Sequence, residues 1–205
     1  GEKLEWCYED GLSGYLQEAL QGQDLFIPLF EGAQFAEEDD ENYALGEGAE
    51  WVVAWTLEGP VVRESFVNLI ATSAGGTHEA GLRDGLFQAV KNFAELHSLL
   101  PKGLRLLPED VFARVSFVLS AKILDPQFQG QIKERLNSRD AVRMISTFVR
   151  NALELRLNSE VEDGKKLADL VIRQAQARVR STQRVEKRKS SGVAVLPGKL
   201  TDCES

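Results

Sequence analysis

The sequence predicts an α+β domain, in which an antiparallel or mixed sheet of about four strands has helices packed on one face. Two observations lead to this class. Short strand-like runs bounded by turn residues occur at 51–57, 63–73 and 114–124. Longer segments with apolar residues at helical spacing occur at 77–100 and 138–157. A chain of 205 residues can bury one such core with extensions, or two small ones.

The N-terminal part predicts a short strand at 3–8, a helix at 10–21 and an interrupted strand at 25–35. One helical stripe carries Leu12, Tyr15, Leu16, Ala19 and Leu20. The acidic segment 36–50 follows and is interpreted as a mobile hairpin loop. Clustered carboxylates can bind calcium, but the Asp-x-Asp-x-Asp-Gly spacing is absent, so solvation is the favoured interpretation.

The middle of the chain predicts a hairpin and then a long helix. Gly59-Pro60 marks a turn, so the runs 51–57 and 63–73 are expected to pair antiparallel. Thr77 is expected to cap a helix that Pro101 ends, with Glu79 in its first turn. Its apolar face has Leu82, Leu86, Val90, Phe93 and His97. A Gly-Gly-Thr sequence could also cradle a phosphate, but it lacks the lysine and spacing of a P-loop.

The C-terminal half predicts a helical turn at Pro108, the strand 114–124 and a loop at 125–136, DPQFQGQIKERL. The helix 138–157 is expected to present Ala141, Ile145, Phe148, Ala152 and Leu155 to the core. Ser159-x-x-Glu162 has the spacing of a capping box for a further long helix. Val161, Leu167, Leu170 and Val171 make the early part of that helix amphipathic, while its polar end is expected to extend past the core.

Composition excludes several classes of protein. The hydrophobic share of 43% and the charged share of 27% are ordinary for a globular chain. No apolar run approaches the roughly 18 residues of a membrane span, and no signal peptide opens the chain. Cys7 and Cys203 lie at opposite ends, so they form neither a disulfide framework nor a metal site. With His78 and His97 as the only histidines, no zinc centre is expected, and a reducing cytoplasm fits best.

The net charge of −8 hides an asymmetry. Residues 1–64 hold 16 acidic and 2 basic side chains, whereas residues 65–205 hold 16 acidic and 22 basic ones. Nine of the basic residues lie within 165–189. A basic stripe in an acidic protein is typical of a surface that meets a polyanion on one side. A solvated helix end, where cations suit the helix dipole, explains the same stripe without a partner.

Three stretches, in order, resemble one family. They are SFVNLIATSAGGTHEAGLRDGL (65–86), PEDVFARVSFVLSAKILDPQFQGQIKERL (108–136) and LPGKLTDC (196–203). Together they are similar to the second, transducer domain of the ATP-binding subunit of bacterial type IIA topoisomerases. Two stretches, WCYEDGLSGYL (6–16) and PEDVFARVSFVLSAK (108–122), resemble the B subunit of the topoisomerase IV branch more than that of the gyrase branch.

The resemblance implies the ribosomal protein S5 domain 2-like fold with a left-handed βαβ crossover, an exception to the usual right-handed rule. It implies a transducer domain at 1–157, a long C-terminal helix at 158–190 and a connector at 191–205. An ATP-binding GHKL domain would precede this piece and a metal-binding TOPRIM domain would follow it. The piece alone is therefore expected to be inactive and to bind neither ATP nor a metal.

In this family the glutamine and lysine of a QTK loop contact the γ-phosphate of ATP, which is held with Mg²⁺ by the neighbouring domain. The resemblance assigns these roles to Gln131 and Lys133, with Lys133 as the catalytic residue. A lysine supplies positive charge to a phosphoryl group that gains negative charge, and an amide supplies a donor. Gly130 permits close approach of the backbone. Ile132 departs from the family's usual threonine, so any hydroxyl contact from that position is absent.

The resemblance also implies partners. The residues expected to face a DNA duplex through its phosphates are Arg83, Arg178, Arg180, Arg184, Lys187, Arg188 and Lys189. The A subunit of topoisomerase IV, in a heterotetramer of two A and two B subunits, and an ATP-dependent dimer of the B subunit itself are the expected protein partners. The expected location is the bacterial cytoplasm, at the nucleoid, with no membrane partner.

Two alternatives stay open at this point. The first is the same domain of the gyrase B subunit. The second is a stand-alone nucleic-acid-binding module, because S5-like domains also occur in ribosomal and RNA-processing proteins. Gln131-Ile-Lys133 and the LPGKLTDC connector favour the topoisomerase, since a ribosomal module needs neither.

Overall fold

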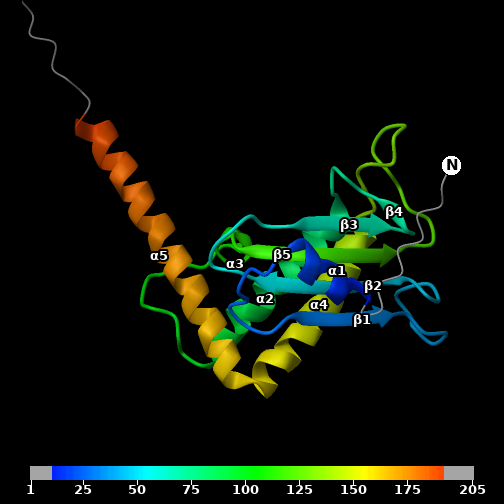
Figure 1. Ribbon diagram of the computed structural model, residues 1–205, viewed down its shortest axis with the longest axis horizontal. Helices are drawn as coiled ribbons and strands as arrows, with labels where there is room; N and C mark the ends of the chain where they lie inside the picture. Colours follow the sequence, from blue (N-terminus) through cyan, green and yellow to red (C-terminus); the bar gives the residue numbers. More distant parts are fainter. Residues whose placement is uncertain (1–10, 192–205) are drawn as a thin grey trace, which may run out of the picture.

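The computed structural model describes residues 11–191, with side chains through residue 186 (Figure 1). The expected strand 3–8 and all but Ser191 of the connector 191–205 lie outside the described residues. The elements in chain order are α1 Gly11–Ala19, β1 Phe30–Phe35, β2 Gly48–Trp55, β3 Arg63–Val67, β4 Ile70–Ala71, α2 Thr77–Leu96, α3 Pro108–Phe112, β5 Val115–Lys122, α4 Arg139–Ser159 and α5 Val161–Ser191.

The sheet is mixed and has five strands in the order β1-β2-β5-β3-β4. The hairpin β1–β2 forms around the acidic segment as predicted, but the hairpin predicted between 51–57 and 63–73 is wrong. β5 lies between the two runs: Val118 pairs antiparallel with Val52 of β2 and parallel with Glu64 of β3. The expected strand 63–73 is divided into β3 and β4 by a turn at Asn68 and Leu69.

β3 and β5 are parallel neighbours, and the chain between them passes through α2 and α3. This is the expected βαβ crossover, and its left-handed sense stays a prediction. β4 adds a two-residue antiparallel edge to the four longer strands. The α+β class with a small mixed sheet is therefore confirmed.

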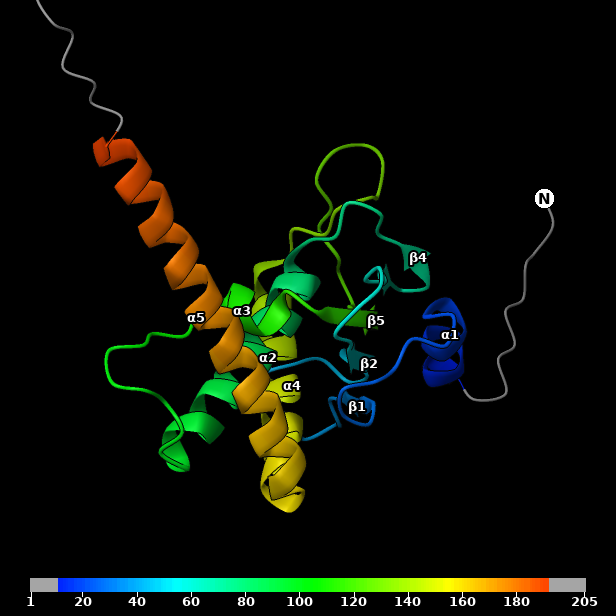
Figure 2. The ribbon, with the colours of Figure 1, turned by 60° about the vertical axis from the view of Figure 1, so that its left-hand side comes forward.

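The two faces of the sheet are covered unequally (Figure 2). Trp51, Val53 and Trp55 of β2 enter the large core, together with Leu82 and Leu86 of α2 and residues of α4 and α5. Residues on the opposite side of the strands, Val52, Ala54 and Val118, pack with Leu16 and Leu20 at α1. The expectation of helices on one face therefore holds for the large core, while α1 covers part of the other face.

The ends and faces of several helices differ from the prediction. α2 ends at Leu96, before Pro101, and the hydroxyl of Thr77 makes no capping bond. Leu155 of α4 is 71% exposed, whereas Leu153 and Leu157 are buried. The last turns of α4 face a different neighbour from the first turns, since α5 folds back beside them (Figure 1).

The predicted capping box at Ser159 is also wrong. Ser159 is the last residue of α4, and its hydroxyl donates to the carbonyl of Leu155 at 2.8 Å. The bond satisfies a carbonyl at the end of α4, so the side chain is unavailable to the first turn of α5.

α5 has 31 residues and leaves the body of the domain part-way along its length (Figure 1). Leu167, Leu170, Val171 and Ala175 are buried in the large core. The side chains from Arg180 to Glu186 are exposed. The prediction that the polar end extends past the core is confirmed.

Candidate functional site

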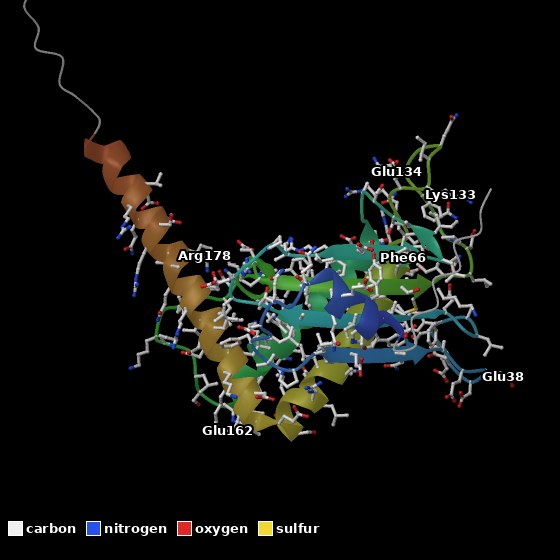
Figure 3. The ribbon with its side chains drawn as sticks, viewed as in Figure 1. Glu38, Phe66, Lys133, Glu134, Glu162 and Arg178 are labelled. Atoms are coloured by element: carbon white, nitrogen blue, oxygen red, sulfur yellow. The ribbon has the colours of Figure 1, made fainter. Side chains whose placement is uncertain are left out.

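The loop after β5 projects from one end of the sheet, and Lys133 and Glu134 lie in its outer part (Figure 3). Gln131 and Lys133 are exposed. The ammonium of Lys133 lies 5.8 Å from the centre of the Phe128 ring. Gly130 has φ 82°, a conformation that favours glycine, although a side chain at this position would meet no atom within 4 Å of its Cβ.

The loop narrows to a neck in which its two limbs are hydrogen-bonded to each other. The amide of Gln129 donates to the carbonyl of Arg135 at 2.9 Å, and the amide of Asn137 donates to the carbonyl of Gln127 at 2.7 Å. Leu136 is buried and forms an antiparallel bridge with Phe128. The exposed Gln131 and Lys133 are thus carried by a closed and partly buried base.

A second set of backbone bonds joins the neck to the segment that precedes α2. The Ala74 amide donates to Glu134 at 3.0 Å, the Leu136 amide to Gly75 at 3.1 Å, and the Thr77 amide to Leu136 at 3.0 Å. A Cβ at Gly76 would lie 2.3 Å from the carbonyl oxygen of Leu136. Gly76 also has φ 142°, so both space and conformation favour glycine.

These contacts decide between the two interpretations of Gly75-Gly76-Thr77. Thr77 is the first residue of α2, its amide donates to Leu136, and its hydroxyl is buried without a hydrogen-bond partner among the described residues. The segment therefore acts neither as a side-chain cap nor as an open cradle for phosphate. It holds the neck of the loop, a role that the sequence did not indicate.

A buried polar cluster lies behind this attachment. Nε2 of His78 is 2.9 Å from the hydroxyl of Thr72, which donates to the carbonyl of Ser65 at 2.9 Å. The hydroxyl of Ser65 lies 2.7 Å from that of Thr72 and donates to a carboxylate oxygen of Glu79 at 2.5 Å. The cluster joins β3 and the residue after β4 to the first turn of α2.

His78 is neutral in this cluster. Its side chain is fully buried, and burial lowers its pKa to about 4. Nδ1 is buried and has no hydrogen-bond partner among the described residues. The proton is therefore placed on Nε2, from which it is donated to the hydroxyl of Thr72.

Arg83 lies in the second turn of α2, beside α3. Its side chain is 45% exposed and lies 3.7 Å from a carboxylate oxygen of Glu109. The guanidinium groups of Arg63 and Arg83 lie 4.6 and 5.7 Å from the centre of the Phe112 ring. The pKa of Arg63 is lowered, first by burial and then by the positive charge of Arg83. Arg83 remains available at the surface, next to a second cation.

Arg178 is bound within the protein. Its Nε and Nη2 donate to the two carboxylate oxygens of Asp110 at 2.8 and 2.9 Å, and Nη2 also donates to the carbonyl of Arg105 at 2.9 Å. The side chain of Asp110 is 2% exposed and also accepts from the amide of Leu107 at 2.8 Å. The hydrogen bond to Asp110 raises the pKa of Arg178. This ion pair fastens α5 to α3, and the sequence analysis missed Asp110.

The other predicted DNA-facing residues follow Arg178 along α5. Arg180 and Arg184 are exposed. Lys187, Arg188 and Lys189 lie in α5, and their side chains are outside the described part. The structure thus brings Arg83 and Arg178 to neighbouring residues of α3, while Lys133 lies at the opposite end of the sheet (Figure 3).

Within residues 11–186, no group of three potential ligands could hold a metal ion. Among the described helices none is long and apolar enough to cross a membrane. A hollow of about 820 Å³ adjoins the base of the loop, between Tyr43, Gln127 and Arg143, and its lining does not include Gln131 or Lys133. The two exposed loop side chains offer an ammonium and an amide as hydrogen-bond donors.

Comparison with known proteins finds one family over most of the chain. The family model described as DNA gyrase B matches residues 11–187. The B subunit of DNA topoisomerase 4 from Pseudomonas aeruginosa is 44% identical over 99% of this chain and 31% of its own length. The chain therefore spans about a third of the length of that relative.

Two solved structures have the same fold. The topoisomerase IV ATP-binding domain of Francisella tularensis, in complex with a small-molecule inhibitor, superposes with a TM-score of 0.71 at 32% identity, over 87% of this chain and 46% of that one. The 43K ATPase domain of Thermus thermophilus gyrase B, in complex with an aminocoumarin, superposes with a TM-score of 0.74 at 22% identity over the same shares.

Proposed function

Because the chain belongs to the DNA gyrase B family, of which the topoisomerase IV B subunit is a branch, we propose that it is a transducer. It comprises the transducer domain at 1–157, the long helix at 158–190 and a connector at 191–205. It couples ATP binding and hydrolysis in an adjacent GHKL domain to passage of a DNA duplex. The identities of 42–44% to named topoisomerase 4 B subunits favour that enzyme over gyrase.

The single observation that carries this proposal is the loop of Gln131 and Lys133. Both side chains are exposed, and the ammonium of Lys133 has no ion pair among the described residues. The neck beneath them is closed by backbone hydrogen bonds and attached to α2. An uncommitted cation and amide on a fixed base can meet a ligand that another domain presents.

ATP with Mg²⁺, when bound in the adjacent domain, supplies the phosphoryl group that is transferred to water. Lys133 places its positive charge beside the γ-phosphate, and the amide of Gln131 donates a hydrogen bond to it. Because the loop and the nucleotide belong to different domains, these contacts favour one relative orientation of the two. Loss of the γ-phosphate removes the contacts, and the domains relax.

The DNA duplex meets the other end of the domain in this proposal. Arg83 and the exposed Arg180 and Arg184, with Lys187, Arg188 and Lys189 further along α5, contact phosphates. Arg178 holds α5 against Asp110, so its role in the path is to set the direction of the helix. The A subunit and a second copy of the B subunit complete the enzyme in the bacterial cytoplasm.

Replacing Lys133 with Ala in the complete protein tests the proposal. We expect ATP turnover to fall on the order of 10²-fold, as for removal of a charge-stabilising donor, while adenine binding persists. Gln131→Ala acts in the same direction. Lys102→Ala, at another exposed lysine on a loop, is the matched control and leaves turnover unchanged. Wild-type turnover in Lys133→Ala would return Lys133 to the class of solvated loop lysines.

Nucleotide binding by the 205-residue chain alone tests the division of the ATP site between two domains. The proposal expects negligible affinity for a non-hydrolysable ATP analogue, because this chain supplies only the phosphate edge of the site. Isothermal titration checks this expectation. Micromolar binding to the chain alone would contradict the division of the site between domains.

A further inference from the structure

The attachment between the loop neck and the start of α2 has no part in the ATP chemistry described so far. It consists of the three backbone bonds from residues 74–77 to Glu134 and Leu136 and of the buried cluster of Ser65, Thr72 and His78 behind them. We infer that this attachment positions Lys133 for the γ-phosphate, so that Gly76, Thr72 and His78 are positioning residues for turnover. The inference rests on the proposed function of Lys133.

The attachment reaches the backbone directly beside Lys133. Glu134 follows Lys133 directly, and its carbonyl accepts from the amide of Ala74 at 3.0 Å. Leu136 both donates to Gly75 and accepts from Thr77, at 3.1 and 3.0 Å. The C-terminal limb of the loop is therefore held from the residue next to Lys133. Any shift of the segment 74–77 moves the backbone from which the lysine extends.

Gly76 packs tightly against the backbone of Leu136. A Cβ on Gly76 would lie 2.3 Å from the carbonyl oxygen and 2.6 Å from the amide nitrogen of Leu136. The neck occupies the space that a side chain would take. Because both closest atoms belong to the backbone, a larger residue forces the neck away and cannot be accommodated by a rotamer change alone.

The segment 74–77 is itself held in place by Thr72 and His78, on either side of it. His78 directly follows this segment, and Thr72 lies shortly before it. Nε2 of His78 lies 2.9 Å from the hydroxyl of Thr72, so the two side chains hold the segment from both sides. The amide of Gly75 donates to the carbonyl of Thr72 at 2.9 Å, which closes the turn. The hydroxyl of Thr72 also donates to the carbonyl of Ser65 in β3, so the turn is tied to the sheet. The sheet thus fixes the turn, and the turn fixes the loop.

The cluster is built from short hydrogen-bonded contacts among two hydroxyl groups and an imidazole, with the carboxylate of Glu79 accepting from Ser65 at its edge. Thr72 and His78 are 3% and 0% exposed. Removing the Thr72 hydroxyl leaves the imidazole N–H and the Ser65 carbonyl without that partner, and a buried polar group without a partner relaxes towards another arrangement. A misplacement of about 1 Å at a reacting group costs up to about 10²-fold in rate, so a small relaxation is measurable.

The test is a double-mutant cycle for ATP turnover in the complete protein. Thr72→Val keeps the shape and removes the hydroxyl; we expect kcat to fall roughly tenfold while KM for MgATP changes by less than about twofold. Thr72→Ser, which keeps the hydroxyl, should have the kcat of the wild type. In a Lys133→Ala background, Thr72→Val has no further effect on kcat, because the group that it positions is gone. Ser65→Ala runs the same cycle with a milder change.

Thr56→Val is the matched control, since Thr56 is fully buried and its hydroxyl accepts from Arg114 away from the loop. It lowers the melting temperature without changing kcat per folded molecule. Wild-type kcat in Thr72→Val and Ser65→Ala, or equal losses with and without Lys133, would overturn the inference while leaving the function of Lys133 intact. Unchanged turnover in Lys133→Ala itself would overturn the proposed function.

Discussion

Lys133 and Arg178, at opposite ends of the sheet, hold their charges in opposite ways (Figure 3). Arg178 donates three hydrogen bonds to Asp110 and Arg105, and its carboxylate partner is 2% exposed. Lys133 is exposed on its loop, and its ammonium lies 5.8 Å from the centre of an aromatic ring. One cation is satisfied inside the chain, and the other is presented to solvent on a fixed base.

A basic residue therefore cannot be assigned to an external ligand from its place in a charged stretch alone. Arg178 and Arg180 belong to the same basic stripe, but only Arg178 faces a buried carboxylate. The partner that decides the role lies 68 residues away in the sequence. A cation that has no carboxylate partner among the described residues, such as Lys133, is the one that remains able to bind an anion.

Replacing Arg178 with Ala has the largest expected effect on the free energy of unfolding, much larger than replacing Lys133. We expect the free energy of unfolding to fall by about 3 kcal/mol, because Asp110 remains buried without its counter-ion. Lys133→Ala changes the same quantity by less than about 0.5 kcal/mol, since it removes an exposed side chain. Urea unfolding of the 205-residue chain measures both. Similar small losses in the two variants would remove the distinction between a bound and a free cation.

Lowering the pH should reduce the free energy of unfolding through His78, which lies in the buried cluster behind the loop neck. Its pKa is about 4 in the folded chain and about 6.5 when unfolded, so the unfolded state binds the proton first as the pH falls. The stabilisation is complete above pH 6.5 and is lost progressively down to about pH 4. At pH 5 we expect a loss on the order of 2 kcal/mol relative to pH 7.

His78→Gln removes this titration while keeping a donor for Thr72. Thermal melting of both proteins between pH 7 and pH 4 isolates the contribution, because every carboxylate is common to the two chains. The difference in melting temperature between wild type and variant should narrow as the pH falls. A difference that stays constant over this range would show that His78 is not held neutral.

Arg83 is intermediate between the two cases, and its expected effect is the smallest. Arg83→Gln should leave basal ATP turnover and the melting curve of the complete protein nearly unchanged, since the pair with Glu109 is exposed and 3.7 Å long. DNA stimulation of turnover should fall, and the slope of log affinity against log salt should decrease by about one.

Lys91→Gln is the matched control for Arg83, because Lys91 lies on the same helix and has an exposed partner, Glu95, at the same 3.7 Å. It removes a similar ion pair from α2 without changing DNA stimulation. Equal DNA stimulation in wild type and Arg83→Gln at matched salt would remove Arg83 from the DNA path.

Local patterns predicted the helices and strands well but failed where distant segments meet. Apolar spacing located α1, α2 and α4, and strand-like runs located β2, β3 and β5. The expected β2–β3 hairpin followed from Gly59-Pro60, but the space beside β2 is taken by β5, which lies far along the chain. The inward face of α4 changes near Leu155 because α5 returns beside it. Both errors concern partners that the local sequence does not specify.

The candidate site shows the same limit. The resemblance to a known family selected Gln131 and Lys133, which the loop composition alone would have left as solvated residues. The support beneath them was not predicted, because it pairs residues 74–77 with 134–136 mainly through backbone atoms. Backbone hydrogen bonds carry little signature in side-chain identity. Gly76 is the one signal that the sequence offers, since its φ of 142° and the close approach of Leu136 both favour glycine.

The length of α5 beyond Arg178 has a mechanical consequence. At 1.5 Å per residue, the helix extends about 20 Å from this ion pair to Ser191. A bend of about 10° in α5 at this pair would displace the far end by about 3 Å while the buried turns before the pair keep their packing. A small local change in the helix would thus become a movement comparable to the reach of a phosphate contact. Asp110 would anchor the helix at this point, and the strength of its buried ion pair with Arg178 would set the resistance of the helix to bending.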